Sequence, residues 1–350
     1  MAPRERVLIL YNEPVLPEDH PDYISEAEVL DNVEAVAEVL AEAPKGYAVD
    51  RLGIGHDPDG LLAHLRAHRP DAIFNLYEGT ADRNVTETYV AGLMDWLEIP
   101  YTGCPHRTLF LAQNKHLTKY LLQAEGVPTA PFLVADRAPL AGCPLSFPVI
   151  VKPASQDASV GVDQASVVTD LEGLNARLAY VLEHYGAPAL VEEFIRGREL
   201  TVAMVEVPDL CVLPTTEAVF PEGGPGYWPI LSYEAKWNKG STEYETTDYH
   251  FQAQLSPDLA GRMEEVARKA FRLLGARDYA RVDFRVRGEE PFVLELNPNP
   301  SFAPDRGLAN NLWAAGITHA EFTVQLVENA LARGRSAARP ARWRGVQQAG

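Results

Sequence analysis

Hydrophobic and polar residues alternate along two neighbouring stretches of the chain, 281–284 and 292–298. Such alternation is typical of β strands, whose successive side chains point to opposite faces. The pattern predicts a hairpin with an apolar face made of Val282, Phe284, Phe292, Leu294 and Leu296. Its polar face is made of Arg281, Asp283, Glu295 and Asn297. With a turn at 288–290, simple pairing places Asp283 opposite Glu295 and Arg281 opposite Asn297.

The polar face of this hairpin carries the groups that a magnesium–phosphate site needs. Mg²⁺ is commonly bound by one or two carboxylates together with phosphate oxygens, rather than by a cage made only of protein. Asp283 and Glu295 supply the carboxylates, Asn297 supplies an amide oxygen, and Arg281 supplies a positive charge. The alternative interpretation is a sheet face that is simply exposed to water.

The first hundred residues alternate between short apolar strands and segments with helical apolar spacing. Strands are predicted at 6–11, 47–52 and 71–76, and helices at 26–43, 61–68 and 86–97. This order predicts a parallel sheet covered by helices.

The rest of the chain mixes helices and strands in a different order. Helices are predicted at 108–125, from the cap Thr169 to 185, at 256–274 and at 318–333, and strands at 147–152, 159–168, 189–195 and 199–205. The segment 221–251 is rich in Gly, Pro and aromatic residues, which predicts a long ordered loop.

A chain of 350 residues is too long for one simple core. The fold class predicted is α/β, with an α+β character in the later part. We expect an N-terminal domain at 1–107, a central lobe at 108–187, a C-terminal lobe with the hairpin at 188–333, and a mobile tail at 334–350.

Acidic residues outnumber basic ones by 49 to 31, which gives a formal net charge of −18. Nucleic acid and anionic membranes both require a basic surface, so neither is expected as a partner. The cysteines Cys104, Cys143 and Cys211 are widely spaced, as is typical of free thiols in a reducing compartment. Neither a signal peptide nor a bilayer-spanning apolar run is evident, so we expect a cytoplasmic protein.

Two further segments suggest a site for a nucleotide, although no P-loop motif is present. Lys152 ends an apolar strand and precedes a flexible loop, where it could hold a phosphate as a point charge. A lysine that extends from a strand edge to water is the alternative. Glu192 lies beside the apolar pair Phe194-Ile195, a connector that could offer backbone groups to a base, with Glu199 free to meet a ribose. An ordinary strand is the competing interpretation there.

Six blocks in this order and spacing resemble the ATP-grasp superfamily, and within it the D-alanine–D-alanine ligase family. The resemblance runs from about 73 to 333. The blocks are Ile99-Pro-Tyr-Thr-Gly103, Asn114-Lys115 with Gly126-Val-Pro-Thr-Ala-Pro131, Phe147-Pro-Val-Ile-Val-Lys-Pro153 with Ser159-Val-Gly161, Val191-Glu-Glu-Phe-Ile-Arg-Gly-Arg-Glu199, Tyr233-Glu-Ala-Lys236, and Arg281-Val-Asp283 with Leu294-Glu-Leu-Asn297. The fold that the resemblance implies is an N-terminal parallel α/β pre-ATP-grasp domain followed by a two-lobed ATP-grasp fold.

The resemblance also implies roles for single residues, with ATP and two Mg²⁺ ions, or Mn²⁺ in their place, as cofactors. The implied phosphate-binding residues are Lys115, Lys152, Ser159 of the glycine-rich loop and, at the γ-phosphate, Lys236. Glu192 and Ile195 would line the adenine, and Glu199 would bind the ribose. The implied metal ligands are Asp283, Glu295 and Asn297. Arg281 and the backbone near Ser301 would stabilise an oxyanion.

The chemistry implied is attack of a carboxylate on the γ-phosphate, followed by displacement of phosphate from the acyl phosphate by an amine. Such a site needs positive charge around the transferring phosphate and hydrogen-bond donors around the later oxyanion. The substrates would be amino acids or small peptide-like acids. The family also implies a homodimer formed through the N-terminal domain.

The chain departs from the family at the end that would bind these substrates. The family's serine for the second substrate is replaced in its approximate place by Asp305-Arg306, and the tyrosine after the Lys236 position is Trp237. The first of two paired serines in the glycine-rich loop is Ala158, and the family's His-Gly loop is replaced by a segment containing Glu78. Loss of these hydroxyl partners predicts that D-alanine is not the physiological pair.

Four charged residues are candidates for the altered substrate site, and each has a simpler interpretation. Arg306 could bind a carboxylate through two hydrogen bonds, or pair with Asp305 on the surface. Glu78 and Glu87 could bind an amine or guanidine, or lie in a solvated loop and in a helix first turn.

The predicted function is an ATP-dependent carboxylate–amine ligase. The alternatives are a ligase that modifies a peptide or protein terminus, a D-alanine–D-alanine ligase proper, and an ATP-binding regulatory protein without turnover. Retention of all the phosphate and metal residues argues against the last of these. A nicotinamide dehydrogenase is disfavoured because the chain lacks a complete dinucleotide fingerprint.

Overall fold

The structure is a computed structural model that describes residues 4–17, 19–20, 23–80, 83–156, 159–224, 226–304 and 306–337. The chain divides into two compact units, one made of Met1–Gly103 with Ala320–Gly350 and the other of Cys104–His319. Most of the tail expected to be mobile, 338–350, lies outside the described residues. The four-part division into domains and lobes stays a prediction.

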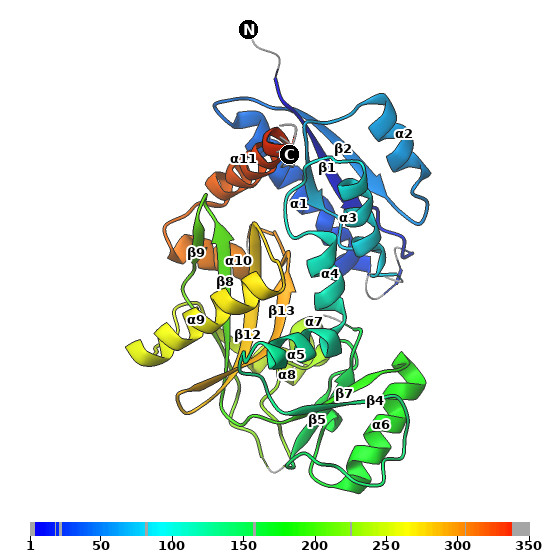
Figure 1. The fold of residues 1–350 in the computed structure, drawn as a ribbon, viewed down its shortest axis with the longest axis vertical. Helices are drawn as coiled ribbons and strands as arrows, with labels where there is room; N and C mark the ends of the chain where they lie inside the picture. Colours follow the sequence, from blue (N-terminus) through cyan, green and yellow to red (C-terminus); the bar gives the residue numbers. More distant parts are fainter. Residues whose placement is uncertain are drawn as a thin grey trace, which may run out of the picture. The chain divides into compact units, whose positions relative to one another are not determined.

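The first unit is built on the parallel sheet that the alternating pattern predicts (Figure 1). Its strand order is β2-β1-β3, from β1 (Arg6–Asn12), β2 (Ala48–Ile54) and β3 (Ala72–Leu76). The helices of this unit are α1 (Tyr23–Glu42), α2 (Asp59–Ala67), α3 (Thr86–Trp96) and α11 (His319–Ala337), the last crossing the unit boundary at its first residue. Strand β1 is buried because its apolar run lies between two strands and beneath helix α1. Helix α11 continues four residues beyond the predicted end at 333.

The second unit contains a small antiparallel sheet with the order β4-β7-β5-β6. Its strands are β4 (Phe132–Ala135), β5 (Val149–Pro153), β6 (Val167–Val168) and β7 (Ala189–Glu193), and helix α6 (Leu171–Tyr185) covers one face. The cap of α6 is Asp170 and not the predicted Thr169, since the Asp170 carboxylate accepts a hydrogen bond from Gly173 N. The predicted strand at 159–168 is wrong for most of its length, because only its last two residues pair with β5.

A second antiparallel sheet in this unit has the order β11-β10-β8-β12-β13, with β9 also paired to β8. Its strands are β8 (Arg198–Glu206), β9 (Leu210–Val212), β10 (Thr216–Val219), β11 (Asp248–His250), β12 (Tyr279–Arg287) and β13 (Glu290–Pro298). Helix α9 (Pro257–Leu273) packs against β8, β12 and β13, and its N-terminus is capped by Ser256, where the predicted helix begins. Strands β4, β9, β10 and β11, all of which are short, were not predicted from the sequence.

The hairpin β12–β13 confirms the predicted pairing of Asp283 with Glu295 and of Arg281 with Asn297. The turn is one residue shorter than predicted, since Arg287 pairs with Glu290. The register shifts between Asp283 and Phe284. Because of this shift, the residues further from the turn still form the predicted pairs. The bulge turns the residues that precede it in β13 to the opposite face of the sheet. Val293 is therefore buried, whereas Phe292 and Leu294 are only half-buried. The prediction that Phe292 and Leu294 join the apolar face is therefore wrong.

The predicted helix at 108–125 is two helices, α4 (His106–Gln113) and α5 (Lys115–Ala124). Asn114 has a non-helical backbone (φ −106°, ψ 75°) and separates them. The break occurs because Lys115 N donates its hydrogen bond to Ala154 O, at the end of the small sheet. It places Lys115 at the first position of a helix beside that sheet.

The segment 221–251 contains more regular structure than the predicted loop. It includes α7 (Tyr233–Trp237), α8 (Thr242–Thr246) and strand β11. Ser232 and Ser241 cap the two short helices through their side chains. Helix α10 (Gly307–Ala314) was also not predicted. No helix among the described residues is both long and apolar enough to span a bilayer.

Candidate active site

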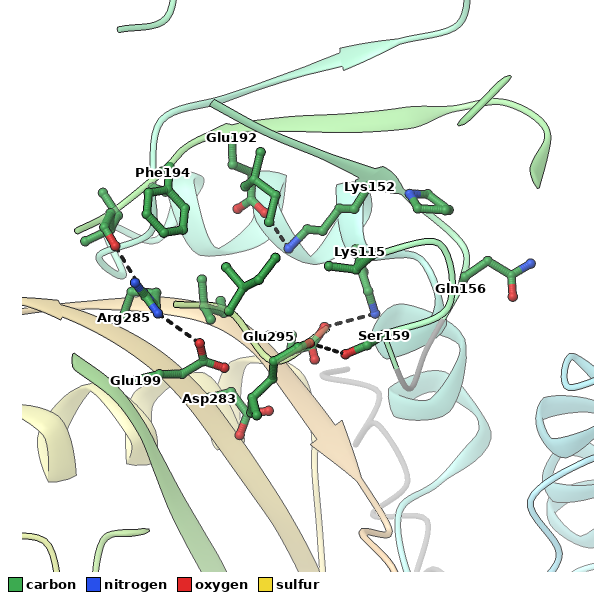
Figure 2. Close-up of a pocket in the computed structure, with 18 of the residues that line it drawn as sticks. Lys115, Lys152, Gln156, Ser159, Glu192, Phe194, Glu199, Asp283, Arg285 and Glu295 are labelled. Atoms are coloured by element: carbon green, nitrogen blue, oxygen red, sulfur yellow. Dashed lines mark hydrogen bonds and ion pairs between the residues drawn. The ribbon is translucent and has the colours of Figure 1, made fainter. Parts of the chain in front are cut away.

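A pocket lies between the two sheets of the second unit, and most of the residues implied in ATP binding line it (Figure 2). The space between its walls, open mouth included, is about 820 Å³. Its charged lining residues are Lys115, Lys152, Glu192, Glu193, Glu199, Lys236, Asp283, Arg285 and Glu295. Apolar walls come from both sheets and from the segment that carries Ile230 and Leu231.

Three lysines from three different elements bring positive charge into this pocket. Lys115 comes from α5, Lys152 from β5 and Lys236 from α7. Lys236 forms no ion pair with any described residue. Desolvation lowers the pKa of the Lys236 ammonium, and the nearby Arg281 lowers it further. A cluster of cations that includes one in no direct ion pair with a described carboxylate fits an anionic ligand such as a triphosphate.

Lys152 and a fourth lysine, Lys119, converge on one buried carboxylate. Lys152 Nζ lies 2.5 Å from Glu192 Oε2, and Lys119 Nζ pairs with the other oxygen. Burial opposes the charge of Glu192, but the two ammonium groups prevail and lower the pKa of its carboxyl. Lys152 is 9% exposed, so the alternative of a lysine extending to water is wrong. Lys119, which was not among the predicted site residues, also donates to Thr129 Oγ1 and, at 3.0 Å, to Val293 O.

Asp283 and Glu295 lie opposite each other on the pocket face of the hairpin, and their partners orient both carboxylates. Thr201 Oγ1 donates to Asp283 Oδ1 at 2.8 Å, and Asn297 Nδ2 donates to Asp283 Oδ2 at 2.7 Å. Lys115 Nζ lies 2.9 Å from Glu295 Oε2. Burial disfavours a charged Glu295, but Lys115, Lys152 and Lys236 lower the pKa of its carboxyl well below the usual range.

These oxygen donors fit Mg²⁺ bound together with phosphate. The described residues contain no group of three or more His, Cys, Asp or Glu side chains arranged around one point. Two carboxylates and an amide, beside lysines that can hold phosphate oxygens, match an ion that completes its shell from a nucleotide and water. The alternative of a solvated sheet face is wrong for Asp283, which is 8% exposed.

The opposite end of the pocket joins the connector after β7 to strand β8. Phe194 and Ile195 are buried and line the pocket, together with the carboxylates of Glu192 and Glu199. Glu199 pairs at 3.0 Å with Arg285, a buried arginine that was not among the predicted site residues.

The glycine-rich loop that contains Ser159 is held in place from two sides. Ser159 Oγ donates to Leu231 O at 2.7 Å, which ties the loop to the segment before α7 (Figure 2). Arg177 on α6 donates to Gly161 O at 2.9 Å and to Ser166 Oγ at 2.8 Å. Gly161 has φ +74°, and a Cβ built there would lie 2.7 Å from Pro153 Cγ. The neighbouring Ala158 lies outside the described residues.

Replacing Gly161 by alanine is therefore expected to displace this loop. Strain at φ +74° and the contact with Pro153 should cost about 1–3 kcal/mol of unfolding free energy and weaken ATP binding about tenfold. Isothermal titration calorimetry with ATP measures the affinity, and urea unfolding measures the stability. Gly142→Ala is the matched control, because its Cβ would meet no atom within 4 Å. Equal ATP affinity in the two variants would contradict the role of the loop.

The residues predicted around the substrates are less closely gathered. Arg281 Nε lies 3.4 Å from Asp283 Oδ1, beside the metal candidates. Ser301 and Arg306 are exposed and do not line the pocket, and neither does Trp237, which is 43% exposed at the end of α7. Asp305 lies outside the described residues, so its pairing with Arg306 stays a prediction.

Glu78 and Glu87 belong to the first unit. Glu78 is exposed in the segment after β3, and Glu87 is in the first turn of α3. Their binding of substrate stays a prediction.

Comparison with known proteins identifies the family of the chain. A family model described as the D-ala D-ala ligase C-terminus matches residues 121–328. This match covers more than half of the chain. The chain belongs to the D-alanine–D-alanine ligase family.

Named relatives in this family extend the similarity over most of the chain. The D-alanine–D-alanine ligase of Rhodospirillum rubrum is 32% identical over 302 residues, which cover 86% of this chain and 92% of the relative. A protein of Sinorhizobium fredii described as uncharacterized, y4sG, is 33% identical over 253 residues, covering 70% of this chain and 72% of that protein.

Solved structures of this family confirm the predicted fold class. The D-alanine–D-alanine ligase from Bacillus anthracis complexed with ATP matches with a TM-score of 0.71 at 20% identity, covering 95% of this chain and 99% of that chain. The ligase from Coxiella burnetii matches with a TM-score of 0.66 at 18% identity, covering 95% and 96%. The parallel sheet of the first unit and the two antiparallel sheets of the second unit are the pre-ATP-grasp and ATP-grasp parts of this fold.

Proposed function

We propose that this protein is an ATP-dependent, ADP-forming carboxylate–amine ligase and that ATP binds in the pocket of the second unit. The observation that carries the proposal is that one pocket brings together three lysines and the facing carboxylates Asp283 and Glu295. The lysines match the charge of a triphosphate, and the carboxylates match the oxygen ligands of Mg²⁺. Membership of the D-alanine–D-alanine ligase family supports the same activity.

The two ends of the pocket suggest how the nucleotide is oriented. We place the base along the connector Phe194–Ile195, with Glu192 beside it and the ribose at Glu199. The phosphates then extend toward Lys115, Lys152 and Lys236, with Ser159 and its loop above them. Bound Mg²⁺ would be held by Asp283, Glu295 and Asn297, and would neutralise charge on the transferring phosphate.

The reaction needs no covalent protein nucleophile. A carboxylate oxygen of the first substrate attacks the γ-phosphorus, the bond to the β–γ bridging oxygen breaks, and ADP leaves. The amine of the second substrate then attacks the carbonyl carbon of the acyl phosphate and loses a proton, and phosphate leaves. Lys236 would stabilise charge on the γ-phosphate, and Arg281 with the backbone near Ser301 would stabilise the tetrahedral oxyanion.

The substrate pair that the relatives favour is D-alanine with D-alanine. Several are named D-alanine–D-alanine ligase, and they match more than four fifths of this chain. They support this pair better than the expectation, drawn from the sequence, that D-alanine is not used. We therefore take formation of the D-alanine dipeptide as the first candidate reaction.

A different acid or amine is the second candidate, and Trp237 favours it. In the family pattern a tyrosine follows the position of Lys236, and its hydroxyl can both donate and accept a hydrogen bond. The indole of Trp237 can only donate. A substrate bound at the exposed end of α7 would therefore meet an indole ring in place of a hydroxyl acceptor.

A phosphate-release assay distinguishes these two candidates. The protein is incubated with ATP and Mg²⁺, first with D-alanine alone and then with pairs of amino acids and small carboxylic acids, and products are identified by mass spectrometry. Rapid release with D-alanine alone supports the first candidate and rules out the second. Slow release with D-alanine but rapid release with another pair supports the second. ATP binding without phosphate release across the whole panel would contradict the proposed ligase.

A further inference from the structure

Arg285 is a buried cation in the nucleotide pocket that none of the roles above uses. Its side chain is 4% exposed, and it lies on β12 directly opposite Glu199 on β8. Directly paired residues of antiparallel strands place their side chains on the same face of the sheet. Arg285 therefore shares the pocket face with Glu199, next to the proposed ribose site.

The guanidinium of Arg285 joins three separate segments around that site. Figure 2 shows its contact with Glu199. Its Nε donates to Ile195 O at 3.0 Å, on the proposed base connector. Its Nη1 donates to Glu199 Oε2 at 3.0 Å and to Pro229 O at 2.8 Å. The guanidinium also lies 5.0 Å from the centre of the Phe194 ring. A planar fork with several fixed donors can hold three acceptors at once, which a lysine cannot do in the same way.

These contacts leave one oxygen of Glu199 available. Arg285 binds Oε2, and no hydrogen bond to a described residue uses Oε1. A glutamate on a pocket wall would otherwise have to lose side-chain freedom when a ligand binds. Because the Glu199 carboxylate is already fixed by Arg285, its free oxygen can accept a hydrogen bond from a ligand hydroxyl at a smaller entropic cost.

We propose that Arg285 is a positioning residue that fixes Glu199 for the ribose of ATP and so lets the pocket distinguish ribonucleotides from deoxyribonucleotides. This inference rests on the proposed function, which places the ribose at Glu199. It goes further by assigning the discrimination between sugars to the pair formed by Glu199 and Arg285. A purely structural arginine would stabilise the fold but would leave that discrimination unchanged.

The test compares binding of ATP, 2′-deoxyATP and 3′-deoxyATP by isothermal titration calorimetry. The unaltered protein should bind ATP about tenfold or more tightly than at least one of the deoxy analogues, as expected for a hydrogen bond to a charged group. In Arg285→Met, ATP affinity should fall about tenfold, and the ratio of ATP to deoxyATP affinity should approach one. In turnover assays, the weaker ATP binding should raise the KM for ATP and leave kcat nearly unchanged.

Two further variants keep this test decisive. Arg285→Lys retains the charge and the alkyl stem but not the fork, and should show an intermediate ratio even if the methionine variant folds poorly. Arg287→Met is the matched control, because Arg287 lies two residues further along β12 and pairs with Glu290 at the surface. It should keep both the affinity and the ratio of the unaltered protein.

The possible failures are distinguishable. ATP binding with an unchanged ratio in both Arg285 variants overturns the inference but leaves the proposed function standing. An unaltered protein that binds ATP and its deoxy analogues equally also overturns the inference alone. An unaltered protein that does not bind ATP overturns the proposed function, and this inference with it.

Discussion

Substituting Glu295 by glutamine is expected to lower kcat about a thousandfold while leaving the protein folded. Glutamine keeps the shape of the side chain but removes the charge that faces Asp283 and pairs with Lys115. A neutral amide would bind Mg²⁺ more weakly than a carboxylate does. It would also leave the positive charge of the lysines in the pocket less fully neutralised. Phosphate release measures the loss of turnover, and circular dichroism checks the fold.

Glu290→Gln is the matched control for this experiment. Glu290 begins the same strand, β13, but its side chain is 66% exposed, and among the described residues its ion-pair partner is the exposed Arg287. It should retain full turnover. The Mg²⁺ dependence of ATP binding gives a second readout, which Glu295→Gln should weaken and Glu290→Gln should not. Near-normal turnover in a folded Glu295→Gln protein would contradict the metal assignment.

Substituting Glu192 by glutamine should have the largest effect on stability, a loss of about 3–5 kcal/mol of unfolding free energy. Glu192 and Lys119 are each 1% exposed, so the change would leave buried ammonium groups without a counter-ion. The folded-state pKa of Glu192 lies below its ordinary value of 4.5. Its stabilising effect is therefore present above that ordinary pKa and is lost as pH falls through the lowered one. Urea unfolding at pH 7 and below pH 4 measures both the loss and its decline.

The adjacent Glu193 supplies the control for Glu192. Ser146 N donates a hydrogen bond to the Glu193 carboxylate, and the amide oxygen of a glutamine can accept the same hydrogen bond. Glu193→Gln should therefore change the unfolding free energy by less than about 1 kcal/mol. Adding Lys119→Met to Glu192→Gln should recover part of the loss, because it removes one of the buried cations. Equal stability of the Glu192 and Glu193 variants would show that the buried pairs contribute nothing.

The hairpin register was predictable because alternation fixes which residues face the pocket. The bulge was not predictable, because it arises where the pairing set by a two-residue turn meets the register of the pocket residues. The pairing of Asp283 with Glu295 was therefore correct, while the facing of Phe292 and Leu294 was wrong. The break at Asn114 was hidden in the same way, because apolar spacing continues through both helices and the break depends on a contact with Ala154.

Three polar residues of the site were missed although a signal for them was present. Lys119 lies one helical turn after Lys115, Thr201 lies two residues after Glu199, and Arg285 lies two residues after Asp283. Each therefore shares a face with a residue that was predicted. The sequence did not reveal the partners of these residues, because Glu192, Asp283 and Glu199 contact them from other elements of the fold.

The most direct test of the proposed reaction follows an oxygen atom. The carboxylate substrate found by the phosphate-release assay is labelled with ¹⁸O in both carboxyl oxygens, and the released phosphate is examined by mass spectrometry. Formation of an acyl phosphate predicts one ¹⁸O atom in each phosphate, because the attacking carboxylate oxygen leaves with phosphorus. Phosphate released at the same rate without label would contradict the account.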